Sequence, residues 1–192
     1  MADYFRHNVG MLWAEDYKFL PYKKKVIDQY QLALYVEQGY TYVKSFNGQK
    51  YEHSTMPHWC KSLGGIFGMF QQEFSFYKIC TLDISPPSLL SVNDYCKKYE
   101  TNKHDVLHSL LMLEDWQPGQ YLEIDGEAIV NWAQGDWFQW KASVPFAYSN
   151  VGTENWYCCK IIGKTTYTGQ LEELFLFNIP DYQSAGKASH PL

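Results

Sequence analysis

Short apolar segments separated by polar turns dominate the chain from Ser75 onward. Their side chains follow the period of β-strands, and the turns between them contain glycine or proline. Asp125-Gly126 lies between two of these segments and is a strong two-residue hairpin signal. Short strands at this spacing favour a β-sandwich or a jelly roll. The predicted strands are 75–84, 108–115, 120–125, 127–132, 137–142 and 155–163.

The first part of the chain has a helical period instead. Residues 21–39 begin with a proline, which is well tolerated in the first turn of a helix, and they end with a glycine, which commonly closes one. Apolar side chains recur along this segment at the spacing of one helix face, which predicts an amphipathic helix. The apolar positions are Val26, Ile27, Tyr30, Leu34 and Tyr35.

The segments between these elements carry weaker signals. Residues 41–46 have the β-branched and aromatic character of a strand, whereas a glycine and a proline within 47–58 predict a loop. A short helix is expected at 59–70, in spite of its three glycines. Three further segments are assigned more loosely: 91–104 as a short helix or polar loop, 171–179 as a helix or one more strand, and 183–192 as a loose tail.

The composition is that of an ordinary globular chain. Of the 192 residues, 46% are hydrophobic and 19% are charged, which argues against disorder. No apolar run approaches the roughly 18 residues that a membrane span needs. Charges interrupt the N-terminal segment, where a signal peptide would have an apolar core. We therefore expect a cytoplasmic protein that does not act at a membrane.

The cysteines and the basic residues argue against several kinds of site. The 5 cysteines are odd in number and lack CxxC spacing, so neither a disulfide framework nor a zinc ribbon is expected. The formal net charge is −5, and the 16 basic residues include a single arginine, Arg6. Because a nucleic-acid surface needs a basic face, nucleic acid is not an expected partner.

Four segments in the second half carry a family resemblance through their order and spacing. They are LEDWQPGQYLEIDG, VNWAQGDWFQW, VPFAYSNVG and WYCCKIIG. Together they resemble the distal half of the Fe(II)/2-oxoglutarate-dependent oxygenases, particularly the short prolyl-hydroxylase-like type of marine phages and bacteria. The resemblance covers residues 75–165. It implies a mainly β protein with flanking helices, built on a cupin-like double-stranded β-helix, or jelly roll.

This resemblance also suggests how the chain is organised. We expect one domain spanning 1–192. Within it, 1–74 would form an N-terminal helical supporting region, 75–165 the jelly-roll core, and 166–192 a C-terminal extension.

The metal site that the resemblance implies lacks its imidazoles. In the family, an HxD motif and a distal histidine in a PHxxxN segment hold Fe(II), and a basic residue on the next strand pairs with 2-oxoglutarate. Here Val92 and Asp94 stand at the HxD positions, Phe146 at the distal histidine and Trp156 at the usual arginine. One carboxylate does not hold iron in competition with water. A degenerate metal site is therefore expected, with no cofactor.

Two features leave activity open. Lys160 lies on the same side of its strand as Trp156, so it could bind the 2-oxoglutarate carboxylate in place of the arginine; the alternative is a lysine that reaches solvent. His104 and His108 are four residues apart, a helical metal spacing, with Asp94 and Asp105 nearby in the sequence. The alternative is that His108 opens a strand.

The other reactive or aromatic residues give no specific site. His53 and His58 flank a loop without ligand partners, and Cys158-Cys159 lies in a strand with no adjacent base. The glycines at 64–68 do not match a phosphate-binding loop. Sheet packing is the expected role of the tryptophans Trp116, Trp132, Trp137 and Trp140.

The sequence thus predicts a non-catalytic, oxygenase-like jelly-roll protein that acts in binding or assembly, with a protein partner or a second copy of itself. The family resemblance suggests a phage-encoded protein of the host cytoplasm or the virion. One alternative is an active dioxygenase that uses Fe(II) and 2-oxoglutarate to hydroxylate a protein or small molecule, with Asp94, His104 or His108, and Lys160 as its residues. Another is a metal-free, cupin-like ligand-binding protein.

Overall fold

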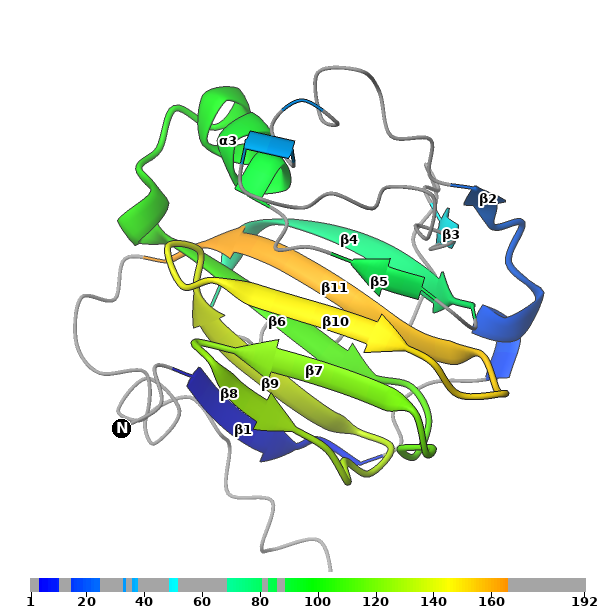
Figure 1. Cartoon of the computed structure of the whole chain (residues 1–192). Helices are drawn as coiled ribbons and strands as arrows, with labels where there is room; N and C mark the ends of the chain where they lie inside the picture. The colour runs from blue at the N-terminus through cyan, green and yellow to red at the C-terminus, as the bar shows by residue number, and fades with distance from the viewer. Residues whose placement is uncertain are drawn as a thin grey trace, which may run out of the picture.

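Two antiparallel sheets stacked face to face form the body of the protein (Figure 1). The computed structural model describes residues 4–10, 15–24, 33, 36–37, 49–51, 69–80, 83–85 and 89–165. Within these ranges the larger sheet runs β1 (Tyr4–Asn8), β9 (Asp136–Lys141), β6 (Val106–Met112), β11 (Trp156–Lys164), β4 (Phe70–Ile79), β3 (Gln49–Tyr51) and β2 (Lys23–Lys24). The smaller sheet runs β5 (Asp83–Ser85), β10 (Phe146–Asn150), β7 (Gln120–Ile124) and β8 (Glu127–Ile129).

The chain passes repeatedly from one sheet to the other. It runs from β4 to β5, back to β6, across to the β7–β8 hairpin, back to β9, across to β10 and back to β11. Strands that are neighbours in a sheet are therefore distant in the sequence, as in the pairing of β11 with β4. This is the double-stranded β-helix, or jelly roll, that the sequence predicted.

The hairpin between β7 and β8 confirms the Asp125-Gly126 signal. Ile124 pairs with Glu127, and the two residues between them have positive φ angles of 53° and 78°. Two successive positive φ values define the primed turn whose twist matches that of the flanking strands. Aspartate tolerates this conformation and glycine adopts it at no steric cost, so the local sequence is sufficient to place the turn.

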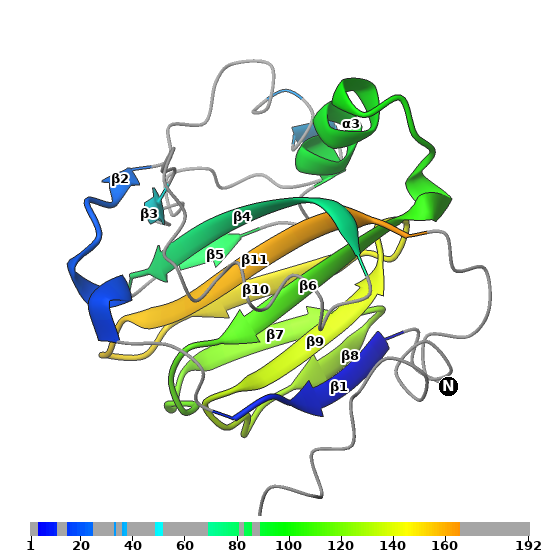
Figure 2. The ribbon, with the colours of Figure 1, turned by 180° about the vertical axis from the view of Figure 1, so that it is seen from behind.

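The centre of the larger sheet is buried on both faces, and β6 is buried along its whole length. Leu110 and Met112 point between the two sheets, where they pack with Leu122 and Ile124 of β7. Leu107 and Leu111 point to the opposite face. Figure 2 shows this second face from behind. It is covered in part by η1 (Glu15–Phe19), whose Tyr17 is fully buried there.

A helix covers one end of the larger sheet. This helix, α3 (Leu89–Lys98), lies above β4 and β11 in Figure 1 and leads through η2 (Lys103–Asp105) into β6. It has one apolar face, and Val92 and Tyr95 from that face pack with Val106, Ala142 and Ile162 of the sheet. No helix among the described residues is long and apolar enough to cross a membrane.

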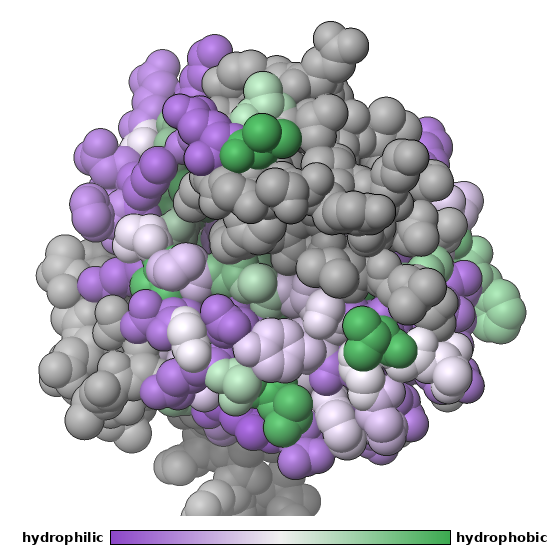
Figure 3. Space-filling view, viewed as in Figure 1, coloured by the Kyte–Doolittle hydropathy of each residue, from purple (hydrophilic) through white to green (hydrophobic). Residues whose placement is uncertain are grey.

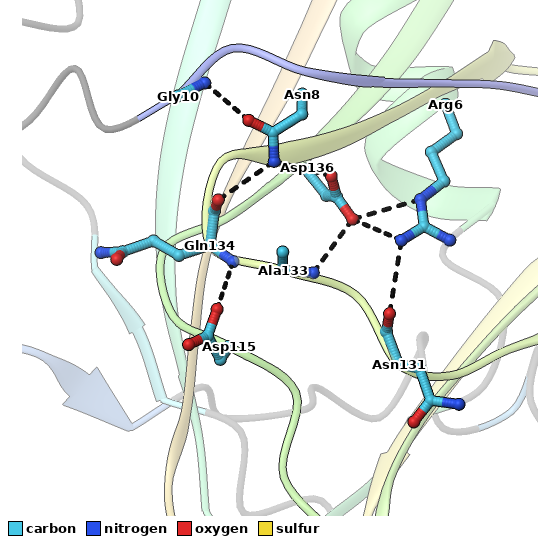
Figure 4. A network of polar contacts seen from close by, with 8 residues as sticks. All are labelled: Arg6, Asn8, Gly10, Asp115, Asn131, Ala133, Gln134 and Asp136. Carbon is cyan, nitrogen blue, oxygen red and sulfur yellow. Dashed lines mark hydrogen bonds and ion pairs between the residues drawn. The ribbon is translucent and has the colours of Figure 1, made fainter.

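An ionic network fixes the edge strand β1 to β9 (Figure 4). Asp136 is 5% exposed and accepts hydrogen bonds from Arg6 Nε at 3.1 Å, Arg6 Nη2 at 2.5 Å and Asn8 Nδ2 at 2.8 Å. The backbone N–H of Ala133 donates to the same carboxylate at 3.0 Å. The only arginine of the chain therefore closes one edge of the sandwich.

Several predicted boundaries were wrong because strand pairing overrode the local pattern. The strand expected at 75–84 is two strands: β4 begins at Phe70, where polar Gln71 and Gln72 conceal it, and β5 belongs to the other sheet. Part of the loop expected at 47–58 is β3, which pairs with β4. The start of the helix expected at 21–39 is β2, which pairs with β3, although Ala33, Val36 and Glu37 are helical.

Other expectations on secondary structure are met or lie outside the described residues. The segment 91–104 is mostly helical, as one of its two alternatives proposed, and the apolar strand expected at 108–115 is β6. The expected strand at 41–46, most of the short helix at 59–70 and the segments at 171–179 and 183–192 fall outside the described ranges. At the end of 59–70, Phe70 is in β4 rather than in a helix.

Candidate functional site

Two basic side chains lie in the apolar space between the sheets. On β11, Trp156 and Cys158 face this space, and the two-residue alternation of a strand places Lys160 on the same side. On β6, Leu110 and Met112 face it, and the same alternation adds His108. His108 is 1% exposed and Lys160 is 7% exposed. Buried basic residues in an otherwise apolar core mark this region as the candidate site.

Phe146 lies against both basic groups. Its ring centroid is 5.5 Å from that of His108, with the two rings nearly perpendicular, and Lys160 Nζ lies 5.5 Å from the same centroid. The ring of Trp140, on β9, completes the wall at 5.7 Å from His108 and 5.0 Å from Phe146. Phe146 therefore supplies a cation–π contact to the ammonium group and an edge contact to the imidazole.

The imidazole of His108 is neutral in this environment. Burial lowers its pKa well below the ordinary value of 6.5, and the charge of Lys160 lowers it further. Neither Nδ1 nor Nε2 has a hydrogen-bond partner among the described residues. Buried polar atoms are usually hydrogen-bonded, so two unpartnered nitrogens on one ring call for a physical explanation.

Buried tryptophans of the same core cluster add N–H groups that also need a hydrogen-bond partner. The indole Nε1 of Trp140 is buried without a hydrogen-bond partner within the described ranges, and so are those of Trp132 and Trp156. An indole nitrogen can only donate, and a lysine ammonium can only donate. Of these donors, Lys160 and the indole of Trp140 lie by His108, and they favour a partner rich in acceptor oxygens.

The structure places Val92 and Asp94 away from Phe146. Both lie on α3, where Val92 is buried in the cluster formed with Val106 and Ile162, while Asp94 is exposed. Phe146 belongs to the separate cluster between the sheets. The two segments that the family resemblance assigns to one metal site thus contribute to two different parts of the core.

Trp156 and Lys160 lie at different points along β11. Trp156 is buried and stacks on Trp132, with ring centroids 4.8 Å apart and an interplanar angle of 28°. Lys160 lies four residues further along β11, beside Phe146. Of the two positions considered for a carboxylate partner, Lys160 alone offers a cation. Its ammonium group is inside the protein rather than in solvent.

His104 and His108 do not share a helix face. His104 is exposed on η2, and the chain changes from η2 to β6 before it reaches the buried His108. Across the described part of the chain, no group of three or more His, Cys, Asp and Glu side chains has the geometry to hold a metal ion. His108 therefore belongs to a strand, as the alternative for this histidine proposed, although the strand begins two residues earlier at Val106.

The remaining candidates have structural roles where they are described. Cys158 and Cys159 are buried free thiols, and burial raises the pKa of Cys158, so this thiol is not a nucleophile at neutral pH. The packing role expected for the tryptophans is confirmed for Trp132, Trp137 and Trp140, which are buried. Trp116 is half-buried. His53, His58, Cys60 and the glycines at 64–68 lie outside the described residues.

Sequence reasoning considered His108 and Lys160 separately and did not pair them. In the sheet, β6 and β11 are adjacent: His108 pairs with Ile162, and Leu110 pairs with Lys160. Two inward positions on adjacent strands become diagonal neighbours in this register, which suits long side chains. The alternation of each strand indicated which way its side chains point, but no local signal indicated that the two strands lie side by side.

The comparison with known proteins is informative only at the level of structure. No protein-family model matches the sequence, and no curated protein matches it. Among solved structures, a prolyl-4-hydroxylase from Pseudomonas putida aligns over 85% of this chain and 93% of its own, with a TM-score of 0.50 and 11% sequence identity. This likeness shows that the chain shares the fold of that hydroxylase.

Cupin domains are also similar, at lower scores. A cupin 2 conserved barrel domain protein from Salinispora arenicola aligns over 67% of this chain and 82% of its own, with a TM-score of 0.38 and 11% identity. The chain spans 50% of the length of a structure from Acidithiobacillus ferrooxidans, provisionally named a sugar phosphate isomerase, with 48% of this chain aligned at a TM-score of 0.33 and 14% identity. At such identities the likeness concerns the fold.

Proposed function

We propose that this protein is a non-catalytic jelly-roll protein that binds a small carboxylate between its sheets and acts through binding. The observation that carries the proposal is the burial of His108 and Lys160 beside Phe146, among side chains that are otherwise apolar. Buried basic groups surrounded by hydrophobic and aromatic side chains are typical of sites that recognise small organic acids.

The side chains of this interior do not suit Fe(II). They offer one imidazole, one ammonium group and indole N–H groups, whereas an iron site of this fold needs two imidazoles and a carboxylate. Lys160 brings a positive charge to the region, which disfavours a cation there. Phe146, at the position that the resemblance assigns to the distal histidine, fills that position with a ring. We therefore derive no step through iron.

The active-oxygenase alternative has less support. It requires Asp94 with His104 or His108, but Asp94 and His104 are exposed on α3 and η2, respectively, while His108 is inside the sandwich. A metal-free binding protein needs none of these residues to move. The metal-free, ligand-binding alternative therefore agrees best with where the side chains lie.

Assembly with a protein partner remains part of the proposal, without a surface assigned to it. Figure 3 shows that the described residues over the smaller sheet are mostly polar, with separate apolar spots. Exposed apolar side chains such as Val130 and Val151 are 41% and 59% exposed. Single exposed apolar residues are normal on a protein surface, so the interior site is the feature to test first.

Calorimetric titration in metal-free buffer tests the binding. We expect the wild-type protein to bind 2-oxoglutarate or succinate, and the Lys160→Met variant to bind at least about tenfold more weakly, because a charge-assisted contact is lost. Lys103→Met removes one exposed lysine on η2 and is the matched control, with unchanged affinity. Wild-type protein that binds neither acid would overturn the proposal.

A second assay tests the absence of catalysis. The protein is mixed with Fe(II), 2-oxoglutarate, ascorbate and oxygen, and succinate is measured by mass spectrometry. We expect no succinate above the protein-free control, since the interior lacks the ligands to hold iron. Succinate release that depends on both protein and Fe(II) would contradict the non-catalytic assignment, even if the carboxylate binds.

A further inference from the structure

We propose that His108 is the second binding residue of this interior site, and that the carboxylate enters together with one proton, which the imidazole holds while the ligand is bound. This inference rests on the proposed function. It goes further by identifying the residue that selects the ligand and by linking its binding to pH.

The strand register makes His108 and Lys160 neighbours on one face of the larger sheet. His108 is paired with Ile162 on β11, so Lys160, two residues before Ile162, is its diagonal neighbour on the same face. Both groups contact the ring of Phe146, each at 5.5 Å from the centroid. A carboxylate oxygen that accepts from two nitrogens at about 2.8 Å each keeps them within about 6 Å of one another. The charge of Lys160 also acts on the imidazole, which agrees with a carboxylate held between the two groups.

His108 is prepared to bind such an oxygen because its own nitrogens are unused. Both are buried and have no hydrogen-bond partner within the described ranges. Trp140, whose ring is 5.7 Å away, has an unpartnered indole N–H as well. A neutral imidazole donates from one nitrogen only, whereas an imidazolium donates from both. An anion next to the ring is therefore held best by the protonated form.

The groups that face His108 explain why its imidazole is neutral in the free protein and becomes protonated when the ligand binds. Among the described residues, Lys160 on β11 is the group whose charge acts on the imidazole, whereas β9 and β10 present Trp140 and Phe146, which do not titrate. Burial and the lysine charge both hold the imidazole neutral in the free protein. A bound carboxylate offsets the lysine charge and adds an opposite charge, and both changes favour the imidazolium.

Two titratable groups on the other packed elements, Glu73 and Tyr95, already have partners. Glu73 on β4 is paired with Ile162 on β11 and forms a 2.6 Å ion pair with Lys98 of α3. Tyr95 of α3 donates a hydrogen bond to the carbonyl of Gln71 at 2.8 Å, and burial raises the pKa of this tyrosine. In contrast to these two groups, His108 has no hydrogen-bond partner within the described ranges.

Calorimetry in two buffers with different ionisation enthalpies, such as Hepes and Tris, measures the proton directly. With 2-oxoglutarate and succinate as probes, we expect an uptake approaching one proton per bound acid above pH 6.5. The Kd should rise up to about tenfold for each pH unit, as expected for one linked proton. The His108→Phe variant should bind more weakly, take up no proton and show a Kd that does not vary with pH. The matched control, His104→Gln, alters an exposed histidine and should behave like the wild type.

The outcomes separate this inference from the proposed function. Wild-type protein that binds a probe without proton uptake, and with a Kd independent of pH, overturns the role of His108 but leaves the carboxylate site intact. Wild-type protein that binds neither probe overturns both. If His108→Phe does not fold, NMR of the wild-type histidine rings decides: a buried imidazole that stays neutral on saturation with the probe contradicts the inference.

Discussion

At the scale of single residues, the interior of this jelly roll combines groups that a stable core would avoid. His108 leaves two nitrogens unpartnered within the described protein, and Lys160 carries an ammonium group into the same apolar region. Each of these burials costs free energy that an apolar side chain would not. The aromatic ring of Phe146 offsets part of this cost through its contacts with both groups. Residues kept at such a cost are typical of binding sites.

The first residue-scale prediction concerns acid stability. The unfolded chain protonates His108 near pH 6.5, whereas the folded chain keeps it neutral because burial and Lys160 lower its pKa. The unfolded state therefore binds more protons below pH 6.5, and the free energy of unfolding falls as the pH decreases. In the ligand-free protein this one group should contribute a loss of up to about 1.4 kcal/mol per pH unit.

Urea unfolding of the wild type and His108→Phe at pH 7.5, 6.5 and 5.5 measures this contribution. The difference in unfolding free energy between the two proteins should move in favour of the variant as the pH falls. Because the buried imidazole has no hydrogen-bond partner in the described structure, the variant should be no less stable than the wild type at pH 7.5. A constant difference across this pH range would show that His108 binds protons equally in the folded and unfolded states, which contradicts the lowered pKa.

At the scale of elements, β1 depends on side-chain contacts as well as on its backbone pairing. It has five residues and pairs with β9 at the edge of the described sheet. Asp136 of β9 receives hydrogen bonds from Arg6, Asn8 and the backbone of Ala133. The carboxylate is buried, whereas the side chain of Arg6 is 43% exposed. The two partners of this ion pair should therefore differ in their importance.

We expect Asp136→Ala to lower the free energy of unfolding by about 2–4 kcal/mol, since several donors lose a charged acceptor. Arg6→Ala should cost less, about 1 kcal/mol, because water replaces part of its contact. Urea unfolding of both variants at pH 7 tests the order. The double variant should lose less than the sum of the single variants, because the residues are in direct contact. Equal losses for the two single variants would show that the network acts only through the ion pair.

At the scale of the whole molecule, β6 and β11 form the centre of the protein. Each is paired on both sides in the larger sheet, and every residue of β6 is buried. β8 of the smaller sheet is paired with β7 alone among the described strands. Local opening requires few broken contacts at an edge, whereas the exposure of central amides requires unfolding of the whole domain.

Hydrogen exchange measured by NMR tests this arrangement. The slowest amides should belong to β6 and β11 and should exchange with the free energy of global unfolding, while those of β8 should exchange earlier. Addition of a bound carboxylate should slow the β6 and β11 amides further, since ligand binding stabilises the folded state. Faster exchange in β6 than in β8 would contradict the central place of β6.

Much of this fold could be predicted from the sequence because its signals are local. The alternation of apolar and polar residues located most barrel strands, and Asp125-Gly126 determined a hairpin that needs no distant contact. The apolar–polar pattern failed where pairing with strands distant in the sequence decides the structure. Gln71 and Gln72 conceal the start of β4, and Asp83 begins a strand of the opposite sheet although the apolar pattern continues through it.

The site was predicted less completely than the fold. The resemblance indicated Phe146 as the residue that replaces a metal ligand, and the alternation along β11 indicated that Lys160 could face inward. Neither showed His108 beside them, because this neighbour comes from β6, nearly fifty residues before β11 in the sequence. The helical spacing of His104 and His108 suggested a different geometry, which the change from η2 to β6 replaces.

The sequence by itself thus determined most strands of the second half of the chain, their inward and outward faces and the main hairpin, since these depend on neighbouring residues along the chain. Only the tertiary structure decided that β6 lies next to β11, and therefore that an imidazole and an ammonium group meet at Phe146. Hydrogen-bond pairing between distant strands joins any two segments of suitable pattern, and the choice among them is made by the packing of the whole core.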